Sequence, residues 1–184
     1  VRKVADENGI LIVLDISLVC ENMYFIKMRE PEFMDKSPAE ILRTLCDLAD
    51  IVYFSARKIS CSRGGGIATR NRDLYLRMRD LIPLFEGFLT YGGISVREIE
   101  SMAVGLREAT DWNVIRHSPE FIKYLVDSLD AKGIPVITPA GGLGAHLDAR
   151  GFLPHLTSFD YPAGALAAAL YIVSGVRGME RGTI

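Results

Sequence analysis

Two apolar runs in the first sixty residues predict neighbouring strands that end in polar side chains. Residues 10–14 form a continuous β-branched and leucine run that ends at Asp15. A second run, residues 50–54, is followed by the segment 55–58, Ser-Ala-Arg-Lys. The first run is unbroken, which is typical of a strand covered on both faces of a parallel sheet. A glycine triplet and Ile-Ala-Thr predict a third short strand over residues 64–69.

The sequence between these runs predicts a helix. Ser37 is a hydroxyl cap, Pro38 lies in the first turn, and Glu40 occupies the capping-box position. Apolar residues then follow at helical spacing: Ile41, Leu42, Leu45 and Leu48. The order strand, helix, strand predicts a right-handed crossover unit. Ligands bind at the carboxyl ends of the strands in such open α/β sheets.

The pattern changes near residue 111, where we place a domain boundary. The later predicted elements are helices at 73–85 and 95–108, then a helix at 119–132, strands at 136–137 and 145–148, a helix at 162–173, and a strand or turn at 175–177. We therefore predict an α/β domain over 1–111 and a smaller, incomplete α+β domain over 112–184.

Composition is that of a globular α/β enzyme or part of one. The chain has 184 residues with 49% hydrophobic content, enough to bury a core, and a net charge of −2 that gives no reason to expect nucleic acid as a partner. No run is apolar and long enough to predict a membrane span. The three cysteines, odd in number and widely spaced, favour reduced thiols and a cytoplasmic location (Cys20, Cys46 and Cys61).

The first residues predict an internal fragment of a longer protein. Residues 1–8 lack an initiator methionine and are typical of the last turns of a helix that Gly9 closes.

Asp15 and Lys58, at the ends of neighbouring strands, indicate a pyridoxal phosphate site. A lysine beside an arginine and hydroxyls is suited to a Schiff base with an aldehyde cofactor that also carries a phosphate. A buried aspartate beside the pyridine nitrogen favours the protonated ring, on which the cofactor's electron-sink chemistry depends. Ser55 and Arg57 are candidates to bind the phosphate. Lys58, once displaced by an amino acid, becomes a base for the α-proton.

Several segments together resemble the tryptophanase and tyrosine phenol-lyase family of β-eliminating lyases. They lie in matching order over essentially the whole chain, at residues 14–26, 55–58, 91–93, 102–109 and 175–182. The resemblance implies the aspartate-aminotransferase-like fold, fold type I of the pyridoxal phosphate enzymes. It also implies cleavage of an aromatic L-amino acid, tyrosine or tryptophan, to phenol or indole, pyruvate and ammonia.

The resemblance assigns a role to each candidate residue. Asp15 matches the aspartate that pairs with the pyridine nitrogen, Lys58 the Schiff-base lysine, and Ser55 the hydroxyl on the phosphate side. Arg57 stands where the family usually has a second lysine. Arg177 matches the arginine that binds the substrate α-carboxylate, a role suited to its bidentate geometry.

Other positions depart from the family pattern. Leu18 stands where an arginine is common, Ile59 where an aspartate usually follows the lysine, and Arg63 where an asparagine helps to bind a potassium-like cation. His146 lies three residues later than the family's histidine. Residues 179–182 look more like the tyrosine phenol-lyase version of that segment than the tryptophanase version.

Each assignment also has a purely structural alternative. Asp15 could cap a turn, Lys58 could be a solvated surface residue, and Arg177 could pair with Glu180. The histidines have no metal-ligand spacing, so we predict no metal site on them (His117, His146 and His155).

Three functions stay open at this point. The first is a pyridoxal phosphate lyase; the second is a non-catalytic or partial subunit that keeps the fold for assembly, as Leu18, Ile59 and Arg63 suggest. The third is another fold type I reaction, such as transamination.

The resemblance implies partners as well. The family's N-terminal half supplies the rest of the phosphate cradle, the aromatic residue that stacks on the ring, and the tyrosine that protonates the leaving group. We therefore expect a small amino-acid substrate, and a homo-oligomer (dimer or tetramer) or a complementing N-terminal segment. The sequence leaves open tyrosine against tryptophan, cation dependence and the activity of the fragment alone.

Overall fold

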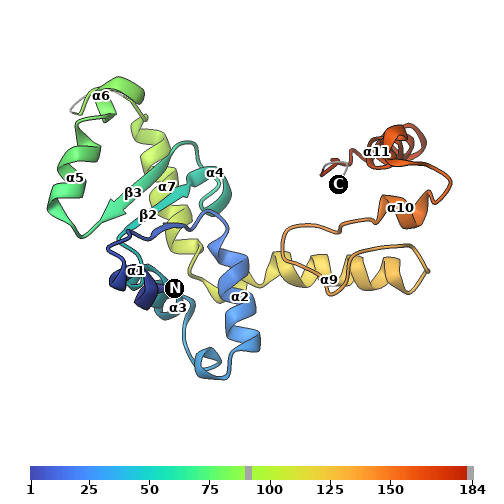
Figure 1. Ribbon diagram of the computed structural model, residues 1–184, viewed down its shortest axis with the longest axis horizontal. Helices are drawn as coiled ribbons and strands as arrows, with labels where there is room; N and C mark the ends of the chain where they lie inside the picture. The colour runs from blue at the N-terminus through green and yellow to red at the C-terminus, as the bar shows by residue number, and fades with distance from the viewer. Residues whose placement is uncertain (90–92, 182–184) are drawn as a thin grey trace. The chain divides into compact units, whose positions relative to one another are not determined.

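The computed structural model describes residues 1–89 and 93–181, which form two compact units, Val1–His117 and Ser118–Ile184 (Figure 1). Tyr91, Gly92 and Gly182, which belong to two of the family-like segments, lie outside the described residues. The proposed domains 1–111 and 112–184 stay a prediction.

The first unit is built on a three-stranded sheet of order β1-β2-β3, with strands Val13–Asp15, Ile51–Ser55 and Gly65–Thr69. β1 and β2 run parallel and β2 and β3 antiparallel, so the predicted parallel pair is confirmed. β1 is shorter than its apolar run, and Ile10 and Val13 are 59% and 54% exposed. The expectation that this run is covered on both faces is wrong here: Leu14 packs against the core on one face, while Val13 and Asp15 on the other face are exposed.

The other elements of the first unit are helices, which come before, between and after the strands in the chain. They are α1 Arg2–Glu7, α2 Val19–Arg29, the 3-10 turn η1 Pro31–Phe33, α3 Pro38–Asp47, α4 Ala56–Ile59, α5 Arg72–Arg79, α6 Ile82–Phe85, α7 Val96–Glu108 and α8 Trp112–Ile115. The capping box of α3 is confirmed: Ser37 N–H donates to Glu40 Oε2 at 2.8 Å, and Ser37 Oγ accepts from Glu40 N–H at 3.3 Å. No element was predicted from the sequence over Val19–Arg29, where α2 lies.

The helix predicted over 73–85 is interrupted in the structure. It divides into α5 and α6, with Asp80 and Leu81 between them. Pro83 explains the division, since proline has no N–H to donate to the carbonyl of residue 79 and its ring crowds the preceding turn.

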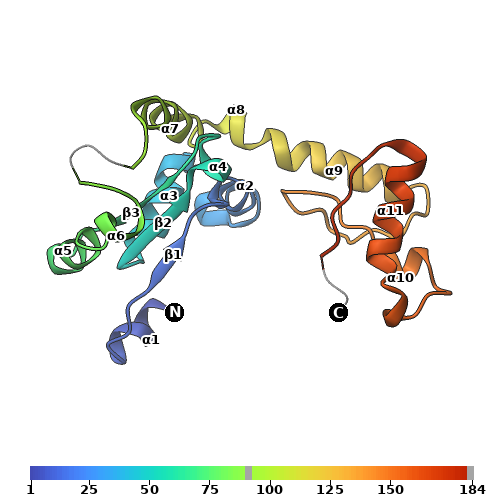
Figure 2. The same ribbon diagram turned by 90° about the horizontal axis from the view of Figure 1, so that it is seen from above.

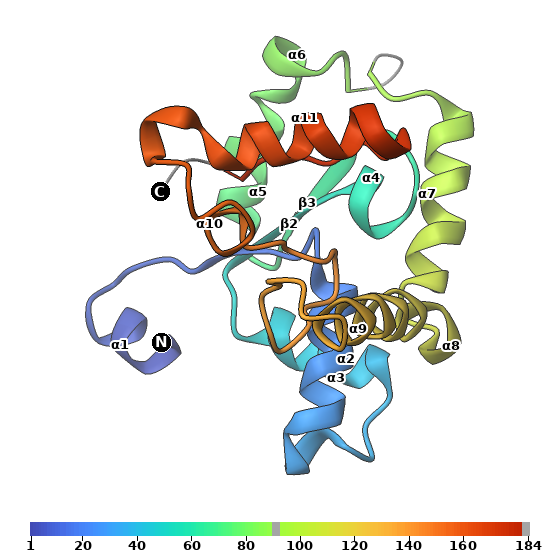
Figure 3. The same cartoon turned by 90° about the vertical axis from the view of Figure 1, so that its right-hand side faces the viewer.

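The core of the first unit joins the start of α2 to α3, α4 and α8. Met23 of α2 is 0% exposed and Ile41 of α3 is 1% exposed. Ile59 of α4 and Ala109, which follows α7, belong to the same cluster. Figure 3 shows α4 beside α7, and Figure 2 shows α2 at the end of β1 opposite to α1. The core therefore anchors the short helix that carries Lys58.

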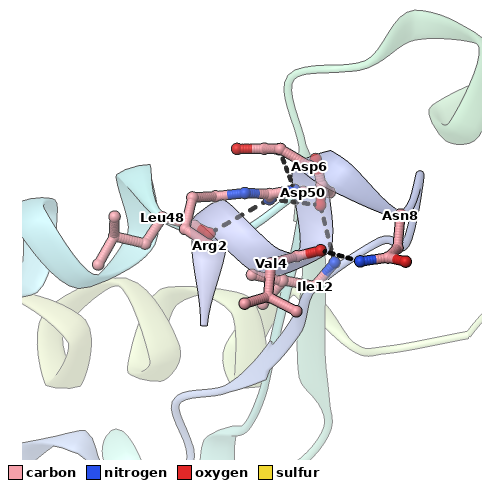
Figure 4. Close-up of polar contacts among 7 residues, drawn as sticks. All are labelled: Arg2, Val4, Asp6, Asn8, Ile12, Leu48 and Asp50. Carbon is pink, nitrogen blue, oxygen red and sulfur yellow. Dashed lines mark hydrogen bonds and ion pairs between the residues drawn. The ribbon is translucent and has the colours of Figure 1, made fainter.

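A separate polar cluster joins α1 to the amino ends of β1 and β2 (Figure 4). The Arg2 guanidinium lies 2.7 Å from Asp50 Oδ2 and 2.6 Å from Asp6 Oδ1. Asp50 Oδ2 also accepts the N–H of Ile12 at 2.7 Å. Gly9 follows α1 with φ +63°, which confirms the predicted left-handed helix end.

The second unit is mainly helical in the residues described. Its helices are α9 His117–Asp130, which begins at the last residue of the first unit, α10 Ala149–Phe152, the 3-10 turn η2 Ser158–Asp160 and α11 Pro162–Ser174. The predicted strands at 136–137 and 145–148 are reduced to one antiparallel bridge between Val136 and Leu147. Residues 175–177 form neither helix nor strand. Over the described parts of both units, no helix has the length and apolarity to cross a membrane.

Candidate functional site

The polar residues predicted to act together lie at the carboxyl edge of the parallel strand pair. Asp15 is the last residue of β1 and pairs in register with Tyr53 of β2. Ser55 ends β2, and α4 starts at the next residue, so Arg57 and Lys58 follow within one turn. Parallel strands bring their carboxyl ends to the same edge of a sheet, and this places the four candidates of the first unit in one region.

Ser17, which was not among the residues predicted from the sequence, hydrogen-bonds to the ends of both strands at this edge. Its N–H and its hydroxyl donate to Asp15 Oδ1 at 2.9 and 2.5 Å. Its Oγ also accepts the backbone N–H of Ser55 at 2.8 Å. Ser17 is only 4% exposed, so one buried hydroxyl links the ends of both strands. An aspartate two residues before a serine is the sequence signal for such a local turn.

Asp15 is held in its charged form. The hydrogen bonds from the Ser17 hydroxyl and N–H lower the pKa of Asp15 below its ordinary value, and the Tyr53 hydroxyl and the positive charge of Lys58 act in the same direction. The same contact with Asp15 raises the pKa of Tyr53. Asp15 is therefore an anion at neutral pH, which suits it to pair with a protonated ring nitrogen.

Burial at the site differs from the expectation. Asp15, Arg57 and Lys58 are exposed and Ser55 is half-buried, whereas the sequence predicted a buried aspartate and a lysine at the mouth of a buried strand. The reason is that Asp15 lies on the exposed face of β1, together with Val13, and that α4 turns Ala56 and Ile59 toward the interior and leaves Arg57 and Lys58 outside.

Arg177 belongs to the other unit. It follows α11 in a segment without helix or strand and is exposed. Asp15, Ser55, Arg57 and Lys58 thus lie together in the first unit, and Arg177 lies in the second.

The positions that depart from the family pattern have different environments. Ile59 is 6% exposed and belongs to the hydrophobic core, so an apolar residue here has a packing role. Leu18 precedes α2 and is 36% exposed. Arg63 is exposed, and its N–H donates to Glu98 Oε2 at 3.0 Å. His146 is exposed, and its carbonyl accepts the N–H of Ile137 at 2.8 Å.

Metal-ligating side chains do not gather in the described structure. Within residues 1–89 and 93–181, no group of three or more His, Cys, Asp or Glu side chains could hold a metal ion.

Comparison with known proteins shows the family of this chain. The model of the beta-eliminating lyase family matches residues 1–183. The chain belongs to the beta-eliminating lyase family. The resemblance inferred from the sequence is thereby confirmed.

Relatives of this chain carry two names, tyrosine phenol-lyase and tryptophanase. The chain is 44% identical to a tyrosine phenol-lyase of Lacrimispora saccharolytica, 40% identical to one of Pasteurella multocida, and 39% identical to a probable tryptophanase of Aeropyrum pernix. Each match covers 100% of this chain and 40% of the relative. The chain therefore spans less than half the length of these relatives.

Proposed function

We propose that this chain is part of a pyridoxal phosphate-dependent lyase that cleaves an aromatic L-amino acid, tyrosine or tryptophan, by β-elimination. Phenol or indole, pyruvate and ammonia are the products. The observation that carries the proposal is the family match over residues 1–183 in a chain whose Asp15 and Lys58 lie on one sheet edge. We also assign the chain to fold type I of the pyridoxal phosphate enzymes.

The side chains present fit the cofactor. Asp15, exposed and anionic, is available to a pyridinium nitrogen, and Lys58 is close enough for its charge to act on Asp15. Bound pyridoxal phosphate stabilises negative charge at the substrate α-carbon. Lys58 would hold the aldehyde carbon and then take the α-proton on its amine. Arg57 and Ser55 would bind the phosphate, with the guanidinium supplying fixed charge.

The remaining roles belong to the second unit and to partners. Arg177 would bind the substrate α-carboxylate through two parallel hydrogen bonds. A homo-oligomer, dimer or tetramer, or a complementing N-terminal segment would complete the site. Large apolar side chains that the chain leaves exposed support such an assembly, among them Leu84 at 74% and Phe85 at 77%. We propose a cytoplasmic location, in keeping with three free cysteines.

A monovalent cation does not fit this chain at the position that the resemblance implies. Arg63 places a permanent positive charge there, and its backbone N–H donates to the Glu98 carboxylate, which holds this residue in position. We therefore propose that the enzyme works without potassium. Replacing potassium chloride by tetramethylammonium chloride should leave its rate unchanged, and a large loss of rate would contradict this.

The cofactor site is tested by adding pyridoxal phosphate to the purified chain, reducing with borohydride and mapping the labelled peptides. The label is expected on Lys58, absent from Lys58→Ala and unchanged in Lys3→Ala. Lys3 is a suitable control because its side chain is 88% exposed on α1. Label scattered over surface lysines in the unmodified chain would refute the cofactor site.

The reaction is tested in a chimaera in which this chain replaces the matching region of the Lacrimispora saccharolytica relative. Phenol released from tyrosine, or indole released from tryptophan, would identify the substrate. A folded chimaera that binds pyridoxal phosphate and releases neither product would favour the non-catalytic subunit or another fold type I reaction.

A further inference from the structure

Lys58 lies on α4, a single helical turn whose shape depends on the residues that follow it. Ala56, the first residue of α4, is 0% exposed. Its carbonyl accepts the N–H of Ser60 at 2.9 Å, the hydroxyl of Ser60 at 2.9 Å and the N–H of Ser62 at 3.2 Å. The N–H of Ala56 donates to the carbonyl of Gly64 at 3.0 Å. The chain that returns from α4 to β3 therefore holds the turn that carries Lys58.

One carboxylate of α7 holds this return segment, which we define as residues 60–64. Glu98 Oε2 accepts the N–H of Arg63 at 3.0 Å and lies 3.0 Å from the hydroxyl of Ser62. The Ser62 hydroxyl also lies 2.9 Å from the Glu98 carbonyl oxygen, and Ser62 is 5% exposed. Glu98 thus supplies the acceptors for a buried hydroxyl and for the adjacent backbone N–H.

The same face of α7 contacts the return segment again two turns later. Gly105 lies seven positions after Glu98, which places the two residues on one side of the helix. A Cβ at Gly105 would lie 2.2 Å from the carbonyl oxygen of Ser60. The return segment is therefore held by a carboxylate at one end of α7 and by close backbone packing near the other end.

The charge of Glu98 strengthens the first of these contacts. The N–H of Arg63 and the Ser62 hydroxyl lower the pKa of Glu98, and the charges of Arg63 and Arg97 act in the same direction. Hydrogen bonds to an ionised acceptor are stronger than those between neutral groups.

We infer that Glu98 is a positioning residue for the cofactor site. Its carboxylate fixes the return segment, and the return segment fixes the α4 turn on which Arg57 and Lys58 are presented. The inference rests on the proposed function, since Lys58 must be the cofactor lysine for its position to matter. Glu98 acts on the site through the return segment, which its carboxylate contacts at Ser62 and Arg63.

The experiment compares Glu98→Ala with Glu98→Gln and Glu100→Ala in the full 184-residue chain. Glu100 lies on the same helix and is exposed, so its replacement makes the same charge change without touching the return segment. Glu98→Gln keeps an oxygen acceptor for the N–H of Arg63. The measurements are the dissociation constant for pyridoxal phosphate, the share of borohydride label on Lys58, and amide hydrogen exchange over residues 60–64. All are made at a temperature where each variant is fully folded by circular dichroism.

Glu98→Ala is expected to weaken pyridoxal phosphate binding about tenfold, the equivalent of one charge-assisted hydrogen bond, and to speed amide exchange in the return segment. Glu98→Gln should recover most of the affinity, and Glu100→Ala should behave as the unmodified chain does. If Glu98→Ala does not fold, the Gln variant takes its place, with a smaller loss expected.

Two failures are distinguishable. Unchanged affinity and unchanged labelling of Lys58 in the folded Glu98 variants, beside normal labelling of the unmodified chain, would overturn the positioning role and leave the proposed function intact. An unmodified chain that takes no label on Lys58 would overturn both.

Discussion

Replacing Gly105 by alanine is the most direct test of the packing beneath the Lys58 turn. The new Cβ would lie 2.2 Å from the carbonyl oxygen of Ser60 and 2.7 Å from its carbonyl carbon and Cα. These are backbone atoms, so no side chain can rotate away. To restore even a 3.0 Å contact, α7 or the return segment must move by about 0.8 Å. Such a shift is large enough to stretch the 3.0 Å bond between Arg63 and Glu98.

Two opposing effects set the magnitude. Alanine is favoured over glycine inside a helix by about 0.5–1 kcal/mol, while overpacking costs about 1–3 kcal/mol. Because the new Cβ meets backbone atoms, we take the upper part of the overpacking range. After the helix preference for alanine is subtracted, we expect the free energy of unfolding to fall by about 2 kcal/mol. In a chain of this length, that loss lowers the melting temperature by about 4–8 °C.

Urea and thermal unfolding of Gly105→Ala, followed by circular dichroism, measure this loss. The matched control is Ala103→Gly, an exposed position two residues away on the same helix. This control measures how much α7 favours alanine over glycine where no clash occurs, and it should destabilise the chain by about 1 kcal/mol. A Gly105→Ala chain as stable as the unmodified chain, or more stable, would refute the close approach of α7 to Ser60.

Three further predictions concern the site and the core. Ser17→Ala should lower the free energy of unfolding by about 1–3 kcal/mol, because the backbone N–H of Ser55 loses the hydroxyl that accepts it. The same change should raise the pKa of Asp15 toward its ordinary value in a carboxyl-carbon NMR titration. An unchanged pKa would count against the Ser17 hydrogen bonds. The Arg2 contact lowers the pKa of Asp50, so its stabilisation is present above the pKa of the unfolded chain and is lost as the pH falls through the lower, folded value. Urea unfolding at a series of pH values should therefore show Asp50→Asn less stable than the unmodified chain at neutral pH and nearly equal to it in acid. A difference in stability that does not change with pH would exclude this ion pair as the cause. Met23→Ala should cost about 2–5 kcal/mol, since Met23 is 0% exposed, and a loss well below this range in the same unfolding assay would mean that the α2 core is packed differently.

Local features of the fold were predictable because short-range chemistry decides them. Ser37, Pro38 and Glu40 specify the start of α3 through contacts within four residues, and Gly9 ends α1 through its own backbone freedom. The single helix predicted at 73–85 was wrong, because the prediction followed the periodicity of the apolar residues and gave too little weight to Pro83, a local signal for a break.

The weak strands of the second unit and helix α2 were harder to predict. The segments at 136–137 and 145–148 are too short to form strands by themselves, and the structure pairs them at one bridge only. Helix α2 is only weakly amphipathic, so the pattern of its apolar and polar residues does not predict a helix. Packing of Val19 and Met23 into the core shared with α3 determines its place.

The sequence by itself determined the family, through the resemblance of segments over the whole chain, and the parallel strand pair, through its apolar runs. It also supplied the candidate residues Asp15, Ser55, Arg57 and Lys58. Only the tertiary structure decided which groups control them. The Ser17 hydroxyl between the two strand ends and the Glu98 carboxylate behind the Lys58 turn act across 38 and 36 residues of chain. Hydrogen bonds between residues so far apart depend on how the sheet and α7 pack, and no local pattern of residue types encodes that packing.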